Sequence, residues 1–392
     1  MVRLSKHLFA LLSLCWVILI HLAACAGVAE PPPDVWLTPS LPHQTEAITT
    51  PTRYVPIAFS TEYSPTKLPT PIPVSTETPV PLGVFSPRLN QGIVPVSYLQ
   101  DSCQYLADRW NPENAQPGTI VVPIMYHGIR KEGGIINDNI TVSEKYFKET
   151  MQHAVDLGFQ TITIDQLAAF LQRNAYIPPR SLLLIIDDRR LGTVRNHFLP
   201  ILQQNNWTMV MAYITGVADH REWQEIKTVL DSGRVEIQAH GFLHNGSTYF
   251  TENTPDEVIH KEIYGPIEVF EENLGIRPIA FIWPGGNFTP ETVVEVRKAG
   301  YQLGFTAYAR GPILFNWIPQ GEPERSASDP LLLLPRYWST AAYMNLDQAV
   351  ELGQQAAEYA RQNQQAELEW YQRYCHGSYP PLSLPTQSTH QP

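Results

Sequence analysis

From about residue 119 onward, the chain alternates between two hydrophobic patterns. Short apolar runs predict strands, and segments with apolar residues three and four positions apart predict helices. The predicted strands are 120–126, 159–164, 182–186, 207–214, 235–239, 279–283, 301–308 and 331–334. The predicted helices follow Ser143 and Asp165 and then cover 221–230, 254–274, 289–300 and 346–362. This alternation predicts an α/β domain with a parallel sheet of about seven strands, more readily closed as a barrel than open.

The first 25 residues have the layout of an export signal. Two cations, Arg3 and Lys6, precede an apolar stretch that ends in Leu-Ala-Ala-Cys at residues 22–25. A charged start, an apolar region and small residues before a cut are typical of secretory signals. The last four residues resemble a bacterial lipobox, so we expect a lipoprotein signal peptide at 1–25 and lipidation at Cys25. An uncleaved membrane helix is the alternative, and either one exports the rest of the chain and holds it at a bacterial membrane, facing outward.

The segment that follows cannot form a core. It holds 15 of the 35 prolines, between Pro31 and Pro95, together with many Ser, Thr and Gln residues and little apolar periodicity. Such a composition predicts a disordered, extended tether over residues 26–98. We therefore expect a lead-in at 99–118, one folded domain at 119–365 and a C-terminal tail at 366–392.

Charge restricts the class of partner. The formal net charge is −11, and basic residues form no long run. Nucleic-acid binding needs a cationic face that neutralises phosphates, so we expect no nucleic-acid partner. The sequence indicates no protein partner either.

Two cysteines, Cys103 and Cys375, lie just outside the two ends of the predicted domain. In an oxidising compartment they could form a disulfide that joins these ends. Two unrelated thiols are an equally good interpretation, because spacing alone does not determine connectivity.

Polar residues with catalytic potential follow three of the predicted strands. Asp187 and Asp188 come directly after 182–186, His240 and His244 follow 235–239, and His127 ends 120–126. Active residues of a parallel barrel lie where strands end, so we expect these side chains to meet. Two imidazoles and one carboxylate suit Zn²⁺, Co²⁺ or Ni²⁺ and leave coordination positions open. Each motif by itself could equally be a helix cap or a surface pair.

Four motifs in order carry a family resemblance. They are Met125-Tyr126-His127, Ile186-Asp187-Asp188, His240-x-x-x-His244 and Phe-Ile-Trp-Pro-Gly-Gly at residues 281–286. This series resembles the polysaccharide deacetylases of carbohydrate esterase family 4, which have a NodB-like deformed (β/α) barrel. The likeness spans about 119–337 and is closest to an exported branch that begins with a Met-Tyr-His strand.

The resemblance implies a role for each residue of the motifs. Asp187 aligns with the catalytic base and His127 with the general acid. Asp188, His240 and His244 align with the ligands of one divalent metal ion, zinc first, with cobalt or nickel as alternatives. Residues aligned with substrate contacts are Tyr126, Trp283, Pro284 and Gly285. The expected function is metal-dependent removal of N-acetyl groups from an envelope or extracellular aminosugar polysaccharide.

Three positions depart from the family pattern. Arg189 stands where the family has Gly, Gly241 stands where Ser or Thr is common, and the large aromatic residue after Pro284 is missing. A long cation beside the metal, or a lost turn with positive φ, could impair activity. Two alternatives therefore stay open: a non-catalytic carbohydrate-binding lipoprotein on the same fold, and an esterase that removes O-acetyl groups from a polysaccharide.

Overall fold

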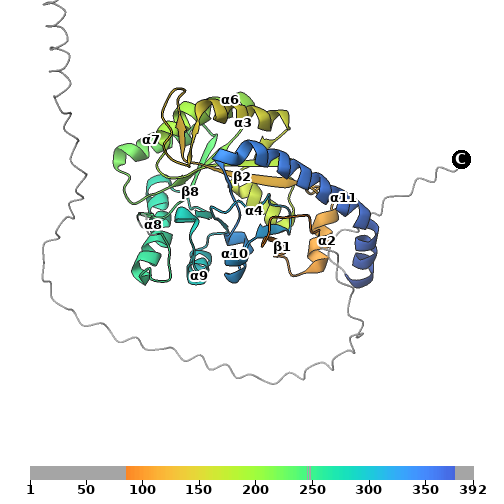
Figure 1. The fold of residues 1–392 in the computed structure, drawn as a ribbon. Helices are drawn as coiled ribbons and strands as arrows, with labels where there is room; N and C mark the ends of the chain where they lie inside the picture. The colour runs from red at the N-terminus through yellow and green to blue at the C-terminus, as the bar shows by residue number, and fades with distance from the viewer. Residues whose placement is uncertain (1–84, 245, 247–248, 376–392) are drawn as a thin grey trace, which may run out of the picture. The chain divides into compact units, whose positions relative to one another are not determined.

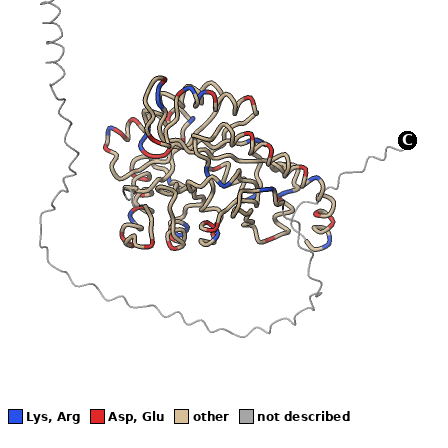
Figure 2. Tube along the Cα trace, viewed as in Figure 1, with Lys and Arg blue, Asp and Glu red and all other residues tan. Residues whose placement is uncertain are grey.

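The computed structural model describes residues 85–244, 246 and 249–375. The predicted signal peptide, Cys25, most of the predicted tether and residues 376–392 lie outside this part of the chain. No helix within the described ranges is both long and apolar enough to cross a membrane. Acidic and basic residues are interspersed over the described domain (Figure 2).

Short strands and longer helices alternate along the domain (Figure 1). The strands are β1 Val94–Val96, β2 Ile120–Tyr126, β3 Gly128–Arg130, β4 Thr141–Ser143, β5 Gln160–Thr161, β6 Arg180–Ile186, β7 Met209–Tyr213, β8 Val235–Ala239, β9 Ala280–Ile282, β10 Leu303–Phe305, β11 Ile318–Gln320 and β12 Tyr337–Trp338. The helices are α2 Ser102–Trp110, α3 Glu144–Asp156, α4 Ile164–Arg173, α5 Leu191–Thr193, α6 Leu199–Asn205, α7 His220–Leu230, α8 Asp256–Leu274, α9 Pro290–Lys298, α10 Glu322–Ser326 and α11 Ala342–Tyr374.

The main sheet is parallel and curled. Its strand order is β12-β2-β6-β7-β8-β9-β10, and β5 also pairs with β6. All of these pairs are parallel. Leu334 forms a bridge to Phe305 of β10, at one end of the sheet. Strand β12 follows three residues later and pairs with β2 at the other end, so the segment 334–338 connects the two ends. In the described chain the seven strands of this path thus form a deformed barrel, with β5 as an eighth strand beside β6, which confirms the predicted fold class.

Alternate residues of β2, β6 and β7 enter two separate cores. In β2, Val122 and Ile124 face the layer that contains α3, α8 and α11, whereas Val121 faces the opposite side of the sheet with α4. Because both faces are covered, β2 and β7 read as unbroken apolar runs, as buried parallel strands do, whereas Glu236 and Gln238 interrupt β8.

The boundary between the predicted strand 159–164 and the helix after it shifts in the structure. The predicted strand 159–164 shortens to β5, because Thr163 rather than Asp165 caps α4 and pairs reciprocally with Gln166. A threonine hydroxyl and a glutamine three residues later form a capping box, which is a stronger start signal than a single aspartate inside the first turn.

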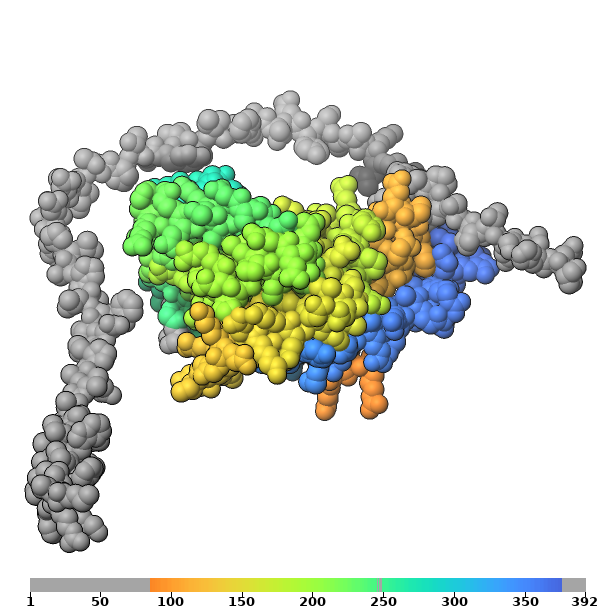
Figure 3. Space-filling view, turned by 90° about the horizontal axis from the view of Figure 1, so that it is seen from above, coloured from red at the N-terminus to blue at the C-terminus, as the bar shows by residue number. Residues whose placement is uncertain are grey.

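The folded domain is also larger than predicted at both ends. Strand β1, inside the predicted tether, pairs with β11, and α11 continues through most of the described part of the predicted tail. Glu367 on α11 is buried and accepts hydrogen bonds from Arg109 (3.0 Å) and Trp110 (2.7 Å) of α2. These contacts hold the two ends of the domain side by side, where α2 and α11 lie together in Figure 3.

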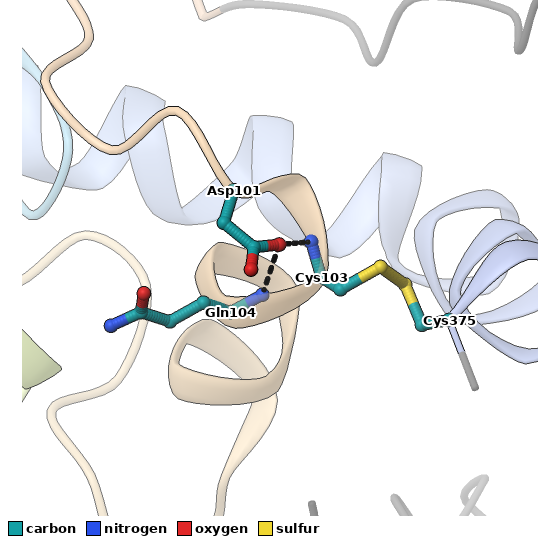
Figure 4. The surroundings of a disulfide bond; sticks show 4 residues. All are labelled: Asp101, Cys103, Gln104 and Cys375. Atoms are coloured by element: carbon teal, nitrogen blue, oxygen red, sulfur yellow. Dashed lines mark hydrogen bonds between the residues drawn. A yellow bond between two sulfur atoms is a disulfide. The ribbon is translucent and has the colours of Figure 1, made fainter. Parts of the chain in front are cut away.

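A disulfide between Cys103 and Cys375 joins the same two helices (Figure 4). The two Cα atoms are 5.5 Å apart, and 272 positions separate the residues along the chain. Asp101 caps α2 beside the bond by accepting from the backbone N–H groups of Cys103 and Gln104.

Replacing both cysteines with serine should lower the free energy of unfolding by about 2–5 kcal/mol, because the unfolded chain regains the entropy of a long open loop. Urea denaturation of the oxidised protein and of the Cys103→Ser/Cys375→Ser variant measures this difference. Equal denaturation midpoints would show that the α2 and α11 contacts alone hold the ends together.

Glu236 on β8 makes the stability of the domain depend on pH. Burial raises the pKa of its carboxyl group to about 7, although its hydrogen bond from the Ile164 N–H acts in the opposite direction. The folded state therefore holds this proton more tightly than the unfolded state, so stability falls as the pH rises from about 4.5 to about 7.

We expect Glu236→Gln to stabilise the protein by about 1–3 kcal/mol at pH 8 and to change little at pH 4.5. Thermal melts at the two pH values test this expectation. A stabilisation of the same size at both values would contradict it.

Candidate active site

The predicted site residues lie together at the carboxyl edge of the parallel sheet. His127 follows β2, Asp187 and Asp188 follow β6, and His240 follows β8. Hydrogen bonds continue the ladder beyond the strand ends, because the Asp187 N–H donates to the Tyr126 carbonyl (2.8 Å). The His240 N–H donates likewise to the Tyr213 carbonyl (3.1 Å). The backbone hydrogen bonds of the sheet therefore fix the positions of Asp187 and His240.

Asp188, His240 and His244 form a compact set of metal donors. One ligand atom from each lies within 4.8 Å of the other two. The Nδ1–H of His240 donates to the Ile282 carbonyl (2.8 Å), and the Nδ1–H of His244 donates to the Gly246 carbonyl (3.0 Å). A carbonyl can only accept, so each Nε2 keeps its lone pair for a metal ion.

Burial favours the neutral form of His240. Its ring is 1% exposed, and loss of solvation lowers its pKa to about 4, although Asp187 and Asp188 act in the opposite direction. A neutral imidazole is the form that coordinates a metal ion, so the ring is in the binding form at neutral pH.

Three residues at this edge adopt left-handed backbone conformations. Asp188 has φ 68°, His244 has φ 64° and Tyr249 has φ 54°. Such conformations are uncommon for residues other than glycine and concentrate at functional sites. At Asp188 the left-handed conformation follows Asp187 directly.

The concern about Arg189 is resolved by its geometry. The positive φ falls on Asp188, one position earlier than expected, so no glycine is needed at 189. Arg189 pairs with Glu222 of α7, through Nε at 2.9 Å and through Nη2, and Glu222 also accepts from the Tyr213 hydroxyl. The expectation that Arg189 stands beside the metal donors is therefore wrong. Arg190 is the nearer cation, with Nη2 3.2 Å from Asp188 Oδ2.

Asp187 is buried against an arginine that the sequence analysis missed. Its carboxylate is 3% exposed, and Oδ1 accepts from Nη1 of Arg336 at 2.6 Å. Burial alone would raise the pKa of Asp187, but Arg336, His240 and His127 outweigh burial and bring the pKa to about 2. Asp187 therefore stays ionised at neutral pH.

His127 reaches the same carboxylate from the neighbouring strand. Its Nε2 lies 3.8 Å from Asp187 Oδ2, and its ring stacks on Trp338 at 6.3 Å between centroids. Its side chain is 16% exposed, so the imidazole is partly accessible from outside the domain.

Two predicted substrate contacts lie in the core instead. Tyr126 is 1% exposed and packs edge-on against Phe147 and Phe198. Trp283 is fully buried, and its indole N–H donates to the Leu332 carbonyl (2.8 Å). Both side chains are buried in the core on the side of the sheet that α3, α8 and α11 cover, so the expectation that they contact a sugar is wrong.

Gly285 is at the site, under an aromatic ring. It has φ 60°, and a Cβ built there would lie 2.5 Å from the ring of Tyr249. That ring also lies edge-on to His244, with centroids 5.2 Å apart. Tyr249 therefore lies against both Gly285 and His244. Pro284 itself is buried and packs beside Gly241.

Comparison with known proteins agrees with this geometry. The sequence model of the polysaccharide deacetylase family matches residues 175–304, which hold both aspartates, both histidines of the donor set and the Trp-Pro-Gly-Gly motif. The chain carries a polysaccharide deacetylase domain.

Named relatives of the deacetylase domain are distant. The poly-β-1,6-N-acetyl-D-glucosamine N-deacetylase of Escherichia coli O157:H7 is 23% identical over 248 residues, which cover 53% of this chain and 36% of that protein. The Streptococcus pyogenes deacetylase PplD, solved with acetate, is 20% identical with a TM-score of 0.48 and covers 59% of this chain and 98% of its own. A de-N-acetylase from Aggregatibacter actinomycetemcomitans is 15% identical with a TM-score of 0.47, over 59% and 99%. This chain therefore spans about a third of the length of the curated E. coli relative.

Residues missed by the sequence analysis complete the site of the deacetylase domain. They are Arg336, Tyr249 and Glu262, which is buried on α8 behind the histidine loop. Glu262 shares a helix face with Pro266 and Phe270, and a carboxylate on an apolar face signals a buried partner. Arg336 comes soon after the apolar run 331–334, and a charged residue next to such a run also signals a buried partner. No local pattern in the sequence identifies Tyr249.

A cavity of about 300 Å³ lies away from these residues. Its lining includes Thr119 at the amino end of β2, together with Tyr105, Phe315 and Trp317. None of the predicted catalytic or metal-binding residues borders it, so the chemistry belongs to the carboxyl edge.

Proposed function

We propose that the domain is a metal-dependent deacetylase that hydrolyses N-acetyl groups of an envelope or extracellular aminosugar polysaccharide. The observation that carries the proposal is the position of one ionised carboxylate, Asp187, between an imidazole and three metal donors. Its Oδ2 lies 3.8 Å from His127 Nε2, and the neighbouring residue Asp188 supplies one of the donors.

One divalent ion, zinc first and cobalt or nickel as alternatives, would be held by Asp188 Oδ1 and by Nε2 of His240 and His244. The donors fit such an ion, because both imidazoles are fixed by carbonyl partners and the set leaves positions open. When bound, the ion would polarise the acetyl carbonyl and stabilise the negative charge that develops on its oxygen.

Proton transfers are assigned to Asp187 and His127. Asp187 would accept the proton of the attacking water, and Arg336 holds its carboxylate ionised and in place. His127, on the opposite side of that carboxylate from Arg336, would protonate the departing sugar nitrogen. The C–N bond of the amide breaks, which releases acetate and a free amine.

Aromatic side chains would contact the sugar. Tyr249 covers Gly285 next to His244, and Trp338 on β12 stacks beside His127, so one ring lies next to the donor set and the other next to the proposed general acid. Aromatic rings with polar tips give apolar contact area and hydrogen bonds together, as sugar rings require. The name of the E. coli relative makes β-1,6-linked N-acetylglucosamine the first polymer to test.

Export and a lipid anchor complete the proposal. Lipidation at Cys25 and a proline-rich tether would fix the domain to a membrane and let it reach a polymer that cannot diffuse to it. Membrane and polysaccharide are the proposed partners.

The non-catalytic alternative loses its main support. It depended on Arg189, which pairs with Glu222 rather than with a metal donor. Removal of O-acetyl groups would use the same residues, so only substrate tests separate an esterase from an amidase.

The test is acetate release by purified protein loaded with Zn²⁺ or Co²⁺, from β-1,6-linked N-acetylglucosamine oligomers, chito-oligomers and acetylated xylan. We expect release from the aminosugar oligomers, and loss of release and of bound metal in Asp188→Asn. Asp165→Asn, on the exposed first turn of α4, is the control and should behave as wild type. No acetate from any of the glycans would refute the deacetylase, and release from xylan alone would favour the esterase.

A further inference from the structure

The loop that carries His244 is wrapped around a single buried carboxylate. Glu262 is 2% exposed, and its oxygens accept from the backbone N–H groups of Phe242 (2.8 Å), Leu243 (2.9 Å) and His244 (2.9 Å). Successive N–H groups that converge in this way form a nest, which ordinarily binds an anion. Here the anion is a side chain of α8, and hydrogen bonds to a charged acceptor are among the strongest in proteins.

Gly241 has the conformation and the space that this arrangement requires. Its φ is +76°, and a Cβ at this position would lie 2.5 Å from Oε2 of Glu262. Any larger residue, including the serine or threonine expected here, would push the carboxylate out of the nest. The glycine at position 241, where the family commonly has Ser or Thr, therefore leaves the space that the Glu262 carboxylate occupies.

The loop is held on its other side as well. The Phe242 ring fills the space above Gly216 and Gly265, where added Cβ atoms would lie 2.5 Å and 2.7 Å from it. The Gly216 N–H donates to the Phe242 carbonyl (2.7 Å). Because these contacts hold Phe242 in place, the hydrogen bonds from the three backbone N–H groups to Glu262 leave the backbone of His244 little freedom.

We infer that Glu262 is a positioning residue that aims His244 at the metal donors. His244 has φ 64° and donates from Nδ1 to Gly246, and this conformation directs its Nε2 toward Asp188 and His240. The backbone bond to Glu262 is what secures a histidine in that left-handed conformation. This inference rests on the metal site of the proposed function and assigns the rigidity of its third ligand to α8.

The experiment compares Glu262→Gln with Glu324→Gln in the full protein. Glu324 is an equally buried glutamate, 1% exposed, that pairs with Arg310 away from the site, so it controls for general loss of stability. Co²⁺ binding is measured by titration, and the visible absorption of the bound ion reports its coordination. We expect Glu262→Gln to weaken Co²⁺ affinity 10- to 100-fold and to alter the spectrum, because an amide presents N–H groups to the nest. Glu324→Gln should bind Co²⁺ as wild type does.

Wild-type affinity and spectrum in a folded Glu262→Gln variant would overturn the inference. If that variant does not fold, Glu262→Asp keeps the charge but shortens the side chain, and it should still weaken Co²⁺ binding. Unchanged binding in Glu262→Asp would then count against a positioning role. A wild-type protein that binds Co²⁺ yet releases no acetate refutes the proposed deacetylase alone, and one that binds no divalent ion refutes both proposals.

Discussion

Asp187→Asn is expected to lower the rate of acetate release by about 10²–10⁴-fold while the protein keeps its metal ion. An amide cannot accept the proton of the attacking water, so the loss falls on kcat. The metal donors Asp188, His240 and His244 are unchanged, so metal affinity should stay close to that of wild type.

Steady-state acetate release and metal content, measured on the same preparations, test this prediction. Asp188→Asn is the matched control one position away, and it should lose metal and activity together. Turnover at the wild-type rate in Asp187→Asn would exclude Asp187 as the base, and loss of metal from that variant would make it a ligand instead.

Arg336→Met is expected to destabilise the protein by about 3–5 kcal/mol at pH 7, because it leaves the Asp187 carboxylate buried without its ionic partner. Arg336 is 1% exposed and also donates from Nε to the Thr306 carbonyl (2.8 Å), so no water can replace it easily. The ion pair holds the pKa of Asp187 at about 2, so its contribution is present above the ordinary value near 4 and is lost as the pH falls toward 2.

Urea denaturation of four proteins measures the coupling: wild type, Arg336→Met, Asp187→Asn and the double variant. The double variant should be more stable than Arg336→Met alone, because it no longer buries an unpaired charge. Additive destabilisation by the two substitutions would mean that the 2.6 Å contact contributes no coupling energy.

The sequence alone predicted the strands of the main sheet except β12, most of the helices and the edge at which the chemistry lies. It did not predict β1, β3, β4 or β11, and the predicted strand 331–334 is wrong, because a 3-10 helix covers Pro330–Leu332. Apolar runs such as 120–126 and 182–186 are local signals, and the carboxyl ends of parallel strands meet at one edge. That is why Asp187, Asp188, His127 and His240 could be brought together without coordinates.

The tertiary structure alone decided where individual side chains point. Both faces of the sheet are apolar, so the sequence of β2 does not predict which face the Tyr126 side chain joins. The direction of the Trp283 side chain could not be predicted for the same reason. The direction of Arg189 depends on Glu222, 33 positions away, and Asp187 depends on Arg336, 149 positions away. Pairings over such separations leave no periodic pattern in a sequence, because they arise only when the barrel brings its strands and loops together.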